Sequence, residues 1–116
     1  MAQVLGGEEF LARVGRIAKT AVDESRKAIR KSAEEHVSVA RALSPDKTGE
    51  LDRSIHIEPG EHDLALRVKV DSPYGMHQEL GTQKMQANPY FRPAFRLVKK
   101  RARARIRRAF RKAMKA

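Results

Sequence analysis

The chain has 116 residues, of which 25 are Lys or Arg, 14 are Asp or Glu and none is Cys. Without cysteine, disulfides, thiolate metal sites and cysteine nucleophiles are excluded. No apolar run approaches the roughly 20 residues that a membrane span needs, and the N-terminus lacks the apolar segment of a signal peptide. We therefore expect a soluble protein that does not use a membrane and that folds as a single domain over residues 1–116.

The net charge of +11 belongs entirely to the C-terminal end of the chain. Residues 1–95 hold 14 basic and 14 acidic residues, whereas residues 96–116 hold 11 basic residues and no acidic one. The chain is therefore a neutral body followed by a strongly cationic segment.

Apolar residues recur at three- and four-residue spacing from Phe10 to Ala40, which predicts an amphipathic helix over residues 8–43. Ser44-Pro45 ends this helix, because proline cannot continue it. At about 1.5 Å per residue the helix would be about 50 Å long, which is more than a small globular domain can cover. We expect the helix either to bend near residues 32–36 or to lie partly against another molecule.

A small antiparallel sheet is predicted over residues 54–80. Apolar and polar residues alternate at 54–58 and at 64–71, and Pro59-Gly60 supplies a turn between them, which is typical of a β-hairpin. The pattern of residues 74–80 fits either a strand or a short helix, and we expect this segment to complete the sheet as a third strand. A contact loop over residues 81–92 and an Arg-rich helix over residues 93–115 follow. This order of elements indicates an α+β fold.

The basic C-terminal helix is the strongest functional signal in the residues themselves. Its apolar stripe predicts packing on the domain or on a neighbour, with the cations on an exposed side. Such a helix can contact nucleic acid, an anionic membrane or an acidic protein, or can simply be a solvated face. A sequence-nonspecific nucleic-acid-binding module is therefore the alternative function. The candidate contacts with DNA or an acidic partner are Lys99, Lys100, Arg101, Arg103, Arg105, Arg107, Arg108, Arg111 and Lys112.

No arrangement of residues predicts catalysis, a metal site or a cofactor. The chain has neither a G-x-S-x-G nucleophile motif nor a phosphate-binding loop. His77-Gln78-Glu79 is similar to the H-x-E fragment of zinc deaminases, but the cysteine-containing half of that motif is missing. We interpret His36, His56, His62 and His77 as surface histidines and expect that the protein is not an enzyme.

Two segments, taken together, resemble a known family. Residues 44–55, SPDKTGELDRSI, resemble the motif P-x-x-T-G-x-L-x-x-S-I, and residues 74–95 resemble Y-x-x-x-x-E-x-G-T followed by M-x-A-x-P-F-x-R-P-A. These are motifs of tailed-phage neck proteins, the tail-completion or head–tail joining proteins of long-tailed phages, prophages and gene-transfer particles. The chain departs from the pattern at Gln86, where the family has proline, and in its arginine-dense end after Lys99.

The resemblance implies a non-enzymatic structural subunit of a virion or phage-like particle, assembled in the bacterial host cytoplasm. It implies a homo-oligomeric ring, with a hexamer favoured, at the neck between the head connector and the tail tube or tail terminator. DNA passes through such a junction, so any contact with DNA is expected to be transient. A structural turn is expected at Thr48, Gly49, Leu51, Ser54 and Ile55. Subunit contacts are expected at Tyr74, Glu79, Gly81, Thr82, Met85, Pro89, Phe91, Pro93 and Phe95.

Overall fold

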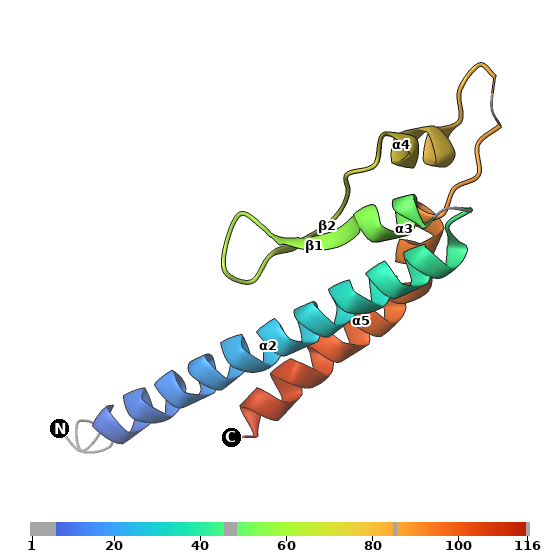
Figure 1. The fold of residues 1–116 in the computed structure, drawn as a ribbon. Coiled ribbons are helices and arrows are strands. Elements are labelled where there is room, and N and C mark those ends of the chain that lie inside the picture. The colour runs from blue at the N-terminus through green and yellow to red at the C-terminus, as the bar shows by residue number, and fades with distance from the viewer. Residues whose placement is uncertain (1–6, 46–48, 85, 116) are drawn as a thin grey trace.

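A computed structural model describes residues 7–45, 49–84 and 86–115. The elements follow in the order α2 (Gly7–Leu43), α3 (Glu50–Ser54), β1 (Ile55–Pro59), β2 (Leu66–Val70), α4 (Pro73–Leu80) and α5 (Phe91–Met114). The two long helices lie antiparallel, the β-hairpin lies beside one half of α2, and α4 lies beyond the hairpin (Figure 1). The long first helix, the antiparallel hairpin and the last helix of the predicted α+β fold are confirmed.

Helix α2 is one continuous helix of 37 residues, with Glu8 and Glu9 in its first turn and Arg41 in its last. These charges match the helix dipole at both ends. The helix runs without interruption through the region where a bend was considered, and the Ser32 hydroxyl there donates to the Ala28 carbonyl at 2.8 Å. The remaining way to cover so long a helix is contact with another element or molecule.

In the part of the chain that the structure describes, the sheet has two strands, paired antiparallel from Ile55 opposite Val70 to Pro59 opposite Leu66. The predicted third strand is wrong, because residues 73–80 form helix α4. Proline fits the first turn of a helix, where its missing N–H is not needed, and Pro73 occupies that position. The connector before the hairpin also contains a short helix, α3, which the sequence pattern did not predict.

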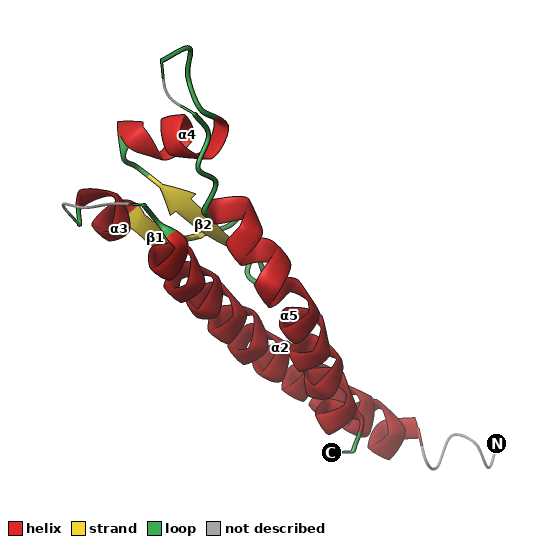
Figure 2. Ribbon diagram, turned by 90° about the vertical axis from the view of Figure 1, so that its right-hand side faces the viewer, coloured by secondary structure: helices red, strands yellow, loops and turns green. Residues whose placement is uncertain are grey.

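Helix α5 packs along α2 over most of its length (Figure 2). Ala94, Val98, Ala109 and Ala113 are buried on α5, and small side chains of this kind let two helices approach closely. At the start of α5, the His36 ring of α2 lies 4.6 Å from the Phe91 ring, and its Nε2 lies 3.1 Å from the Phe91 carbonyl oxygen. The interpretation of His36 as a surface histidine is therefore wrong, because it is 7% exposed. The pair of helices is therefore anchored at the end that carries the hairpin.

The molecule is a rod of 76 × 23 × 22 Å with a radius of gyration of 20.2 Å. A compact domain of this length would have a radius of gyration of about 13 Å. Its accessible surface is 8795 Å², whereas a compact monomer of the same mass exposes about 6400 Å². The chain thus exposes roughly 2400 Å² more than a globular monomer would. Within the described residues, no helix is both long and apolar enough to cross a membrane.

Candidate assembly surface

The predicted structural turn lies at the junction of α2, α3 and β1. Gly49 precedes α3 with φ +80°, in the left-handed region that glycine adopts without strain. Leu51 and Ile55 are buried in the main apolar core, with Ile55 fully inaccessible. The Ser54 hydroxyl donates to the Leu51 carbonyl at 2.6 Å and ends the short helix. Thr48 lies outside the described residues.

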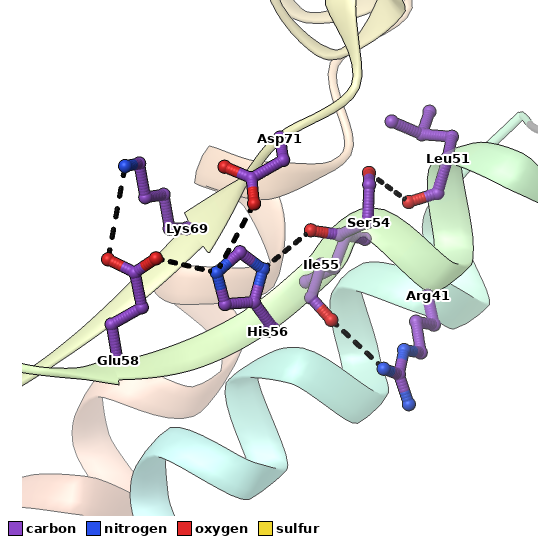
Figure 3. A network of polar contacts seen from close by, with 8 residues as sticks. All are labelled: Arg41, Leu51, Ser54, Ile55, His56, Glu58, Lys69 and Asp71. Carbon is purple, nitrogen blue, oxygen red and sulfur yellow. Dashed lines mark hydrogen bonds and ion pairs between the residues drawn. The ribbon is translucent and has the colours of Figure 1, made fainter.

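Arg41 at the end of α2 holds this junction from the other side. Its Nε donates to the Asp52 carbonyl at 3.0 Å. Its Nη2 donates to the Ile55 carbonyl at 2.9 Å (Figure 3). The guanidinium therefore links α2 to both α3 and β1 through backbone oxygens. Arg41 was not predicted to be part of this junction, and its position in the last helical turn, where cations are favoured, was the available signal.

On the outer face of the hairpin, His56 lies at the centre of a polar cluster (Figure 3). Its Nδ1 is 2.8 Å from the Ser54 carbonyl, and its Nε2 is 2.8 Å from Glu58 Oε1 and 3.5 Å from Asp71 Oδ2. The hydrogen bond to Glu58, followed by that to Ser54, raises the pKa of His56 above its usual value. One nitrogen and two carboxylate oxygens within 4.8 Å of one another could hold a cation. A protonated imidazole already supplies that charge, because both ring nitrogens then donate.

Glu79 connects the end of α4 to the start of α5. Its Oε2 accepts the backbone N–H groups of Tyr90 and Phe91, and its Oε1 accepts that of Arg92, each at 3.0 Å. The free N–H groups of a helix start carry partial positive charge, so a carboxylate is the favoured partner there. Burial raises the pKa of Glu79, but the three backbone donors outweigh it and hold the pKa below its usual value. The carboxylate therefore caps α5 although it lies 11 to 13 residues earlier in the chain.

Tyr90 fixes the same junction from within. Its side chain is 1% exposed, and its hydroxyl donates to the Gly75 carbonyl of α4 at 3.3 Å. A Cβ on Gly75 would lie 2.6 Å from Val70 Cγ1 and 3.0 Å from the Tyr90 hydroxyl. Glycine at this position therefore lets α4 lie close to β2 and to Tyr90. Burial, followed by the Glu79 charge, raises the pKa of Tyr90 to about 12. Tyr90 and Gly75 were both missed as key residues of this region.

The loop over residues 81–89 leaves this junction with both of its ends held. Gly81 has φ +77°, and its N–H donates to the His77 carbonyl at 2.7 Å. The Asn88 N–H donates to the Gln78 carbonyl at 2.7 Å and closes the base of the loop. Residues 82–84 and 86–89 are exposed, so the loop projects from one end of the rod (Figure 1).

The structure places the predicted subunit-contact residues in and beside this loop. Tyr74 and Glu79 lie in α4, Gly81, Thr82 and Pro89 lie in the loop, Phe91, Pro93 and Phe95 lie at the start of α5, and Met85 lies outside the described residues. Two further apolar side chains on α4, Met76 and Leu80, are 70% and 59% exposed.

The opposite end of the rod is the N-terminal part of α2. Helix α2 has 37 residues and α5 has 24, so about 13 residues of α2, roughly 20 Å, extend past α5. The ion pair between Lys112 Nζ and Glu24 Oε2, at 3.4 Å, marks where the coverage by α5 ends. In the uncovered part, Phe10, Leu11 and Val14 are 66%, 68% and 46% exposed. We call this segment, residues 7–19, the α2 extension.

The predicted DNA or acidic-partner contacts all lie on α5, but they do not share one environment. Arg101 and Arg105 both contact the Glu35 carboxylate of α2, and Lys112 contacts Glu24. Lys99, Lys100, Arg103, Arg107, Arg108 and Arg111 are exposed on α5.

An elongated molecule with exposed apolar side chains at both ends has the features of a structural part of a larger assembly. A protein-family model described as "Bacteriophage HK97-gp10, putative tail-component" matches residues 8–81, which is more than half of the chain. The chain belongs to this HK97 gp10-like family and is a structural phage tail component associated with the virion. Curated proteins and solved structures gave no match. The family match runs from α2 through α4 and ends before α5.

Proposed function

We propose that the protein completes the tail at the phage neck, as a non-enzymatic ring subunit that joins the tail to the head. The observation that carries the proposal is the excess of exposed surface, about 2400 Å² over a compact monomer. A stable protein–protein interface removes about 800 Å² from each partner, so this excess is enough for two such contacts per subunit. A subunit in a ring makes two contacts, one with each neighbour.

The α2 extension supplies the first contact surface. Phe10 precedes Ala28 by 18 residues, or about five helical turns, so both lie on the same side of α2. Ala28 is buried and lines a groove with Ala109 of α5. The face that α5 covers in the middle of α2 thus continues uncovered into the extension through Phe10 and Val14. A neighbouring copy that packs there would bury side chains that are now in water.

The loop over residues 81–89, with the exposed side chains of α4, supplies the second contact surface. Its base is fixed by Glu79, Gly81 and Asn88, so the loop loses little conformational freedom when it binds. The two surfaces consist of different residues and lie at opposite ends of the rod. Contact between unlike surfaces is heterologous and closes into a ring when the rotation is right. The resemblance to neck proteins favours six copies, between the head connector and the tail tube or tail terminator.

The proposal is tested with a double variant of the α2 extension, Phe10→Ser and Val14→Ser. Both side chains are exposed in the subunit, so helical content and thermal unfolding should stay close to wild type. Two measurements are made. Mass photometry gives the oligomeric state of the purified protein. Complementation of a phage or prophage that lacks the gene, by a host that expresses the variant, gives the incorporation of the protein into particles. We expect about tenfold or greater loss of incorporation, since two apolar contacts of about 1 kcal/mol each are removed.

Leu43→Ser is the matched control. Leu43 is 41% exposed on the same helix but lies at the other end of it, outside the extension. This variant should assemble like wild type. Normal assembly of the double variant, or equal losses in the double variant and the control, would refute the extension as a subunit contact.

A further inference from the structure

The cations of α5 separate into two groups according to what they contact. The first group faces α2, where Arg101 Nε lies 2.8 Å from Glu35 Oε1 and Arg105 binds the other oxygen of the same carboxylate. Lys112 reaches Glu24 further along. These three cations neutralise two acidic residues of α2 and help to hold the helices together.

The second group lies on the side of α5 that faces away from α2. Arg96, Lys100, Arg103, Arg107 and Arg111 follow one another at intervals of four, three, four and four residues, which places them in one line along a helix. All five are exposed. The buried positions Ala94, Val98, Ala109 and Ala113 lie on the other side of the helix. We call this line of five residues the outer stripe.

No carboxylate among the described residues forms an ion pair with the outer stripe. Five like charges over 16 residues, about 22 Å of helix, repel one another and cost stability. Helix packing does not explain them, because residues of the first group already make the contacts with α2. The stripe is therefore available to an anionic partner outside the chain.

We propose that the outer stripe binds the backbone phosphates of double-stranded DNA without reading its sequence. The partner must carry closely and regularly spaced negative charge along a straight path of about 22 Å. Duplex DNA provides one charge per 1.7 Å of its axis, roughly. Four of the five residues are Arg, whose planar guanidinium matches the phosphate group with two parallel hydrogen bonds. Phe110 and Met114 are exposed beside the C-terminal end of the stripe, but the cations are the feature that continues along its whole length.

Phosphate binding by five cations has a measurable signature. Each neutralised phosphate contributes about −0.9 to the slope of log K against log salt, so five contacts give a slope near −4.5. Raising the salt from about 50 to about 200 mM should then weaken binding roughly 500-fold. Two duplexes of the same length and unrelated sequence should bind equally.

The experiment is a salt titration of the full-length protein with a fluorescent duplex of about 24 base pairs, followed by anisotropy. The stripe variant is Arg103→Gln with Arg107→Gln. The control variant is Arg101→Gln with Lys112→Gln, which removes the same charge from the same helix. In the control, Glu35 keeps its ion pair with Arg105 of α5, and Glu24 keeps its ion pair with Lys27 within α2, so neither carboxylate is left unpaired.

We expect the stripe variant to show a slope near −2.7 and about tenfold or weaker binding at 0.1 M salt, whereas the control keeps a slope near −4.5. Equal changes in slope in the two variants would overturn the proposal, because binding would then follow net charge alone. A wild-type slope shallower than about −2 would overturn it as well. Effective competition by polyglutamate at equal charge concentration would point to an acidic protein and would also overturn it.

DNA binding by the outer stripe is a separate proposal from ring assembly, and different measurements test the two. Sizing and particle incorporation of the stripe variant report on assembly, and the salt slope of the Phe10→Ser and Val14→Ser variant reports on DNA. If the ring proposal fails, the slope of the extension variant should still be that of wild type. If the stripe proposal fails, the extension variant should still lose assembly.

Discussion

Replacing Glu79 with alanine should lower the free energy of unfolding by about 2 kcal/mol. The carboxylate accepts three backbone N–H groups at the start of α5, each at 3.0 Å. Loss of an ordinary capping side chain costs about 1 kcal/mol, and hydrogen bonds to a charged group contribute about 1.5 to 3 kcal/mol. The donor of Arg92 is exposed and can turn to water, so the loss comes mainly from the partly buried donors of Tyr90 and Phe91.

The measurement is urea unfolding followed by circular dichroism, with thermal unfolding as a second readout. A loss of 2 kcal/mol corresponds to a decrease of roughly 8 °C in Tm for a domain of this size. Glu79→Gln keeps one carbonyl acceptor and should lose about half as much. Glu61→Ala serves as the control, because Glu61 is 84% exposed and only loosely paired with Arg67 at 3.5 Å, and it should unfold like wild type. A Glu79→Ala variant as stable as this control would refute the capping role.

The contribution of the Glu79 carboxylate to stability should depend on pH. In the folded protein the pKa of Glu79 lies below its usual value of 4.5, so its contribution to stability is present above pH 4.5. The contribution is lost as the pH falls through the lowered folded-state pKa. The stability difference between wild type and Glu79→Gln should therefore be constant from about pH 7 to 5 and should shrink below pH 4.5. A difference that persists unchanged at pH 2 would show that the charge is not involved.

Two further predictions concern the hairpin and α4. Gly75→Ala should destabilise the protein by about 1 to 3 kcal/mol, because the new Cβ would lie 2.6 Å from the Val70 side chain of β2. Gly15→Ala on α2 is the control: its Cβ would have nothing within 4 Å and should stabilise the protein by about 0.5 to 1 kcal/mol. Equal Tm shifts in the two variants would contradict the close approach at Gly75. Titration by NMR should give His56 a pKa above 6.5, and Glu58→Gln should lower it. Because its pKa is raised in the folded protein, His56 contributes stability below pH 6.5, and this contribution is lost as the pH rises through the folded-state pKa. If Glu58→Gln left the titration of His56 unchanged, the interaction of His56 with Glu58 would be contradicted.

The long helices and the hairpin could be predicted because their periodicity is local. The three-and-four spacing from Phe10 to Ala40 and the alternation around Val68 are properties of contiguous residues, and each matches a single kind of element. Helix α4 is different. Its residues lack a clear period, and its conformation depends on contacts with Val70 and Tyr90, which lie outside the segment. A local pattern cannot report such contacts, so the third strand was the wrong interpretation.

The candidate site shows the same limit at the level of single residues. Glu79 could be selected from its motif, but its partners at Tyr90 to Arg92 depend on how the loop returns to α4. Tyr90 and Phe91 are adjacent aromatic residues with different roles, because Tyr90 is buried under α4 while Phe91 is half-buried against His36. Nothing in the sequence distinguishes the two. The direction in which α5 leaves the junction decides which ring is buried.

The cationic helix is the element whose interpretation depends most on the three-dimensional structure. In the sequence, eleven cations in residues 96–116 form one undivided signal. Antiparallel packing on α2 turns one side of this helix toward Glu24 and Glu35, and the cations on that side become part of the folded structure. The cations on the opposite side of α5 form no ion pairs with α2, because the acidic side chains of α2 cannot reach them. A protein that needed these cations only for its fold would have no use for the outer stripe, so the unpaired side is where an external anion should act.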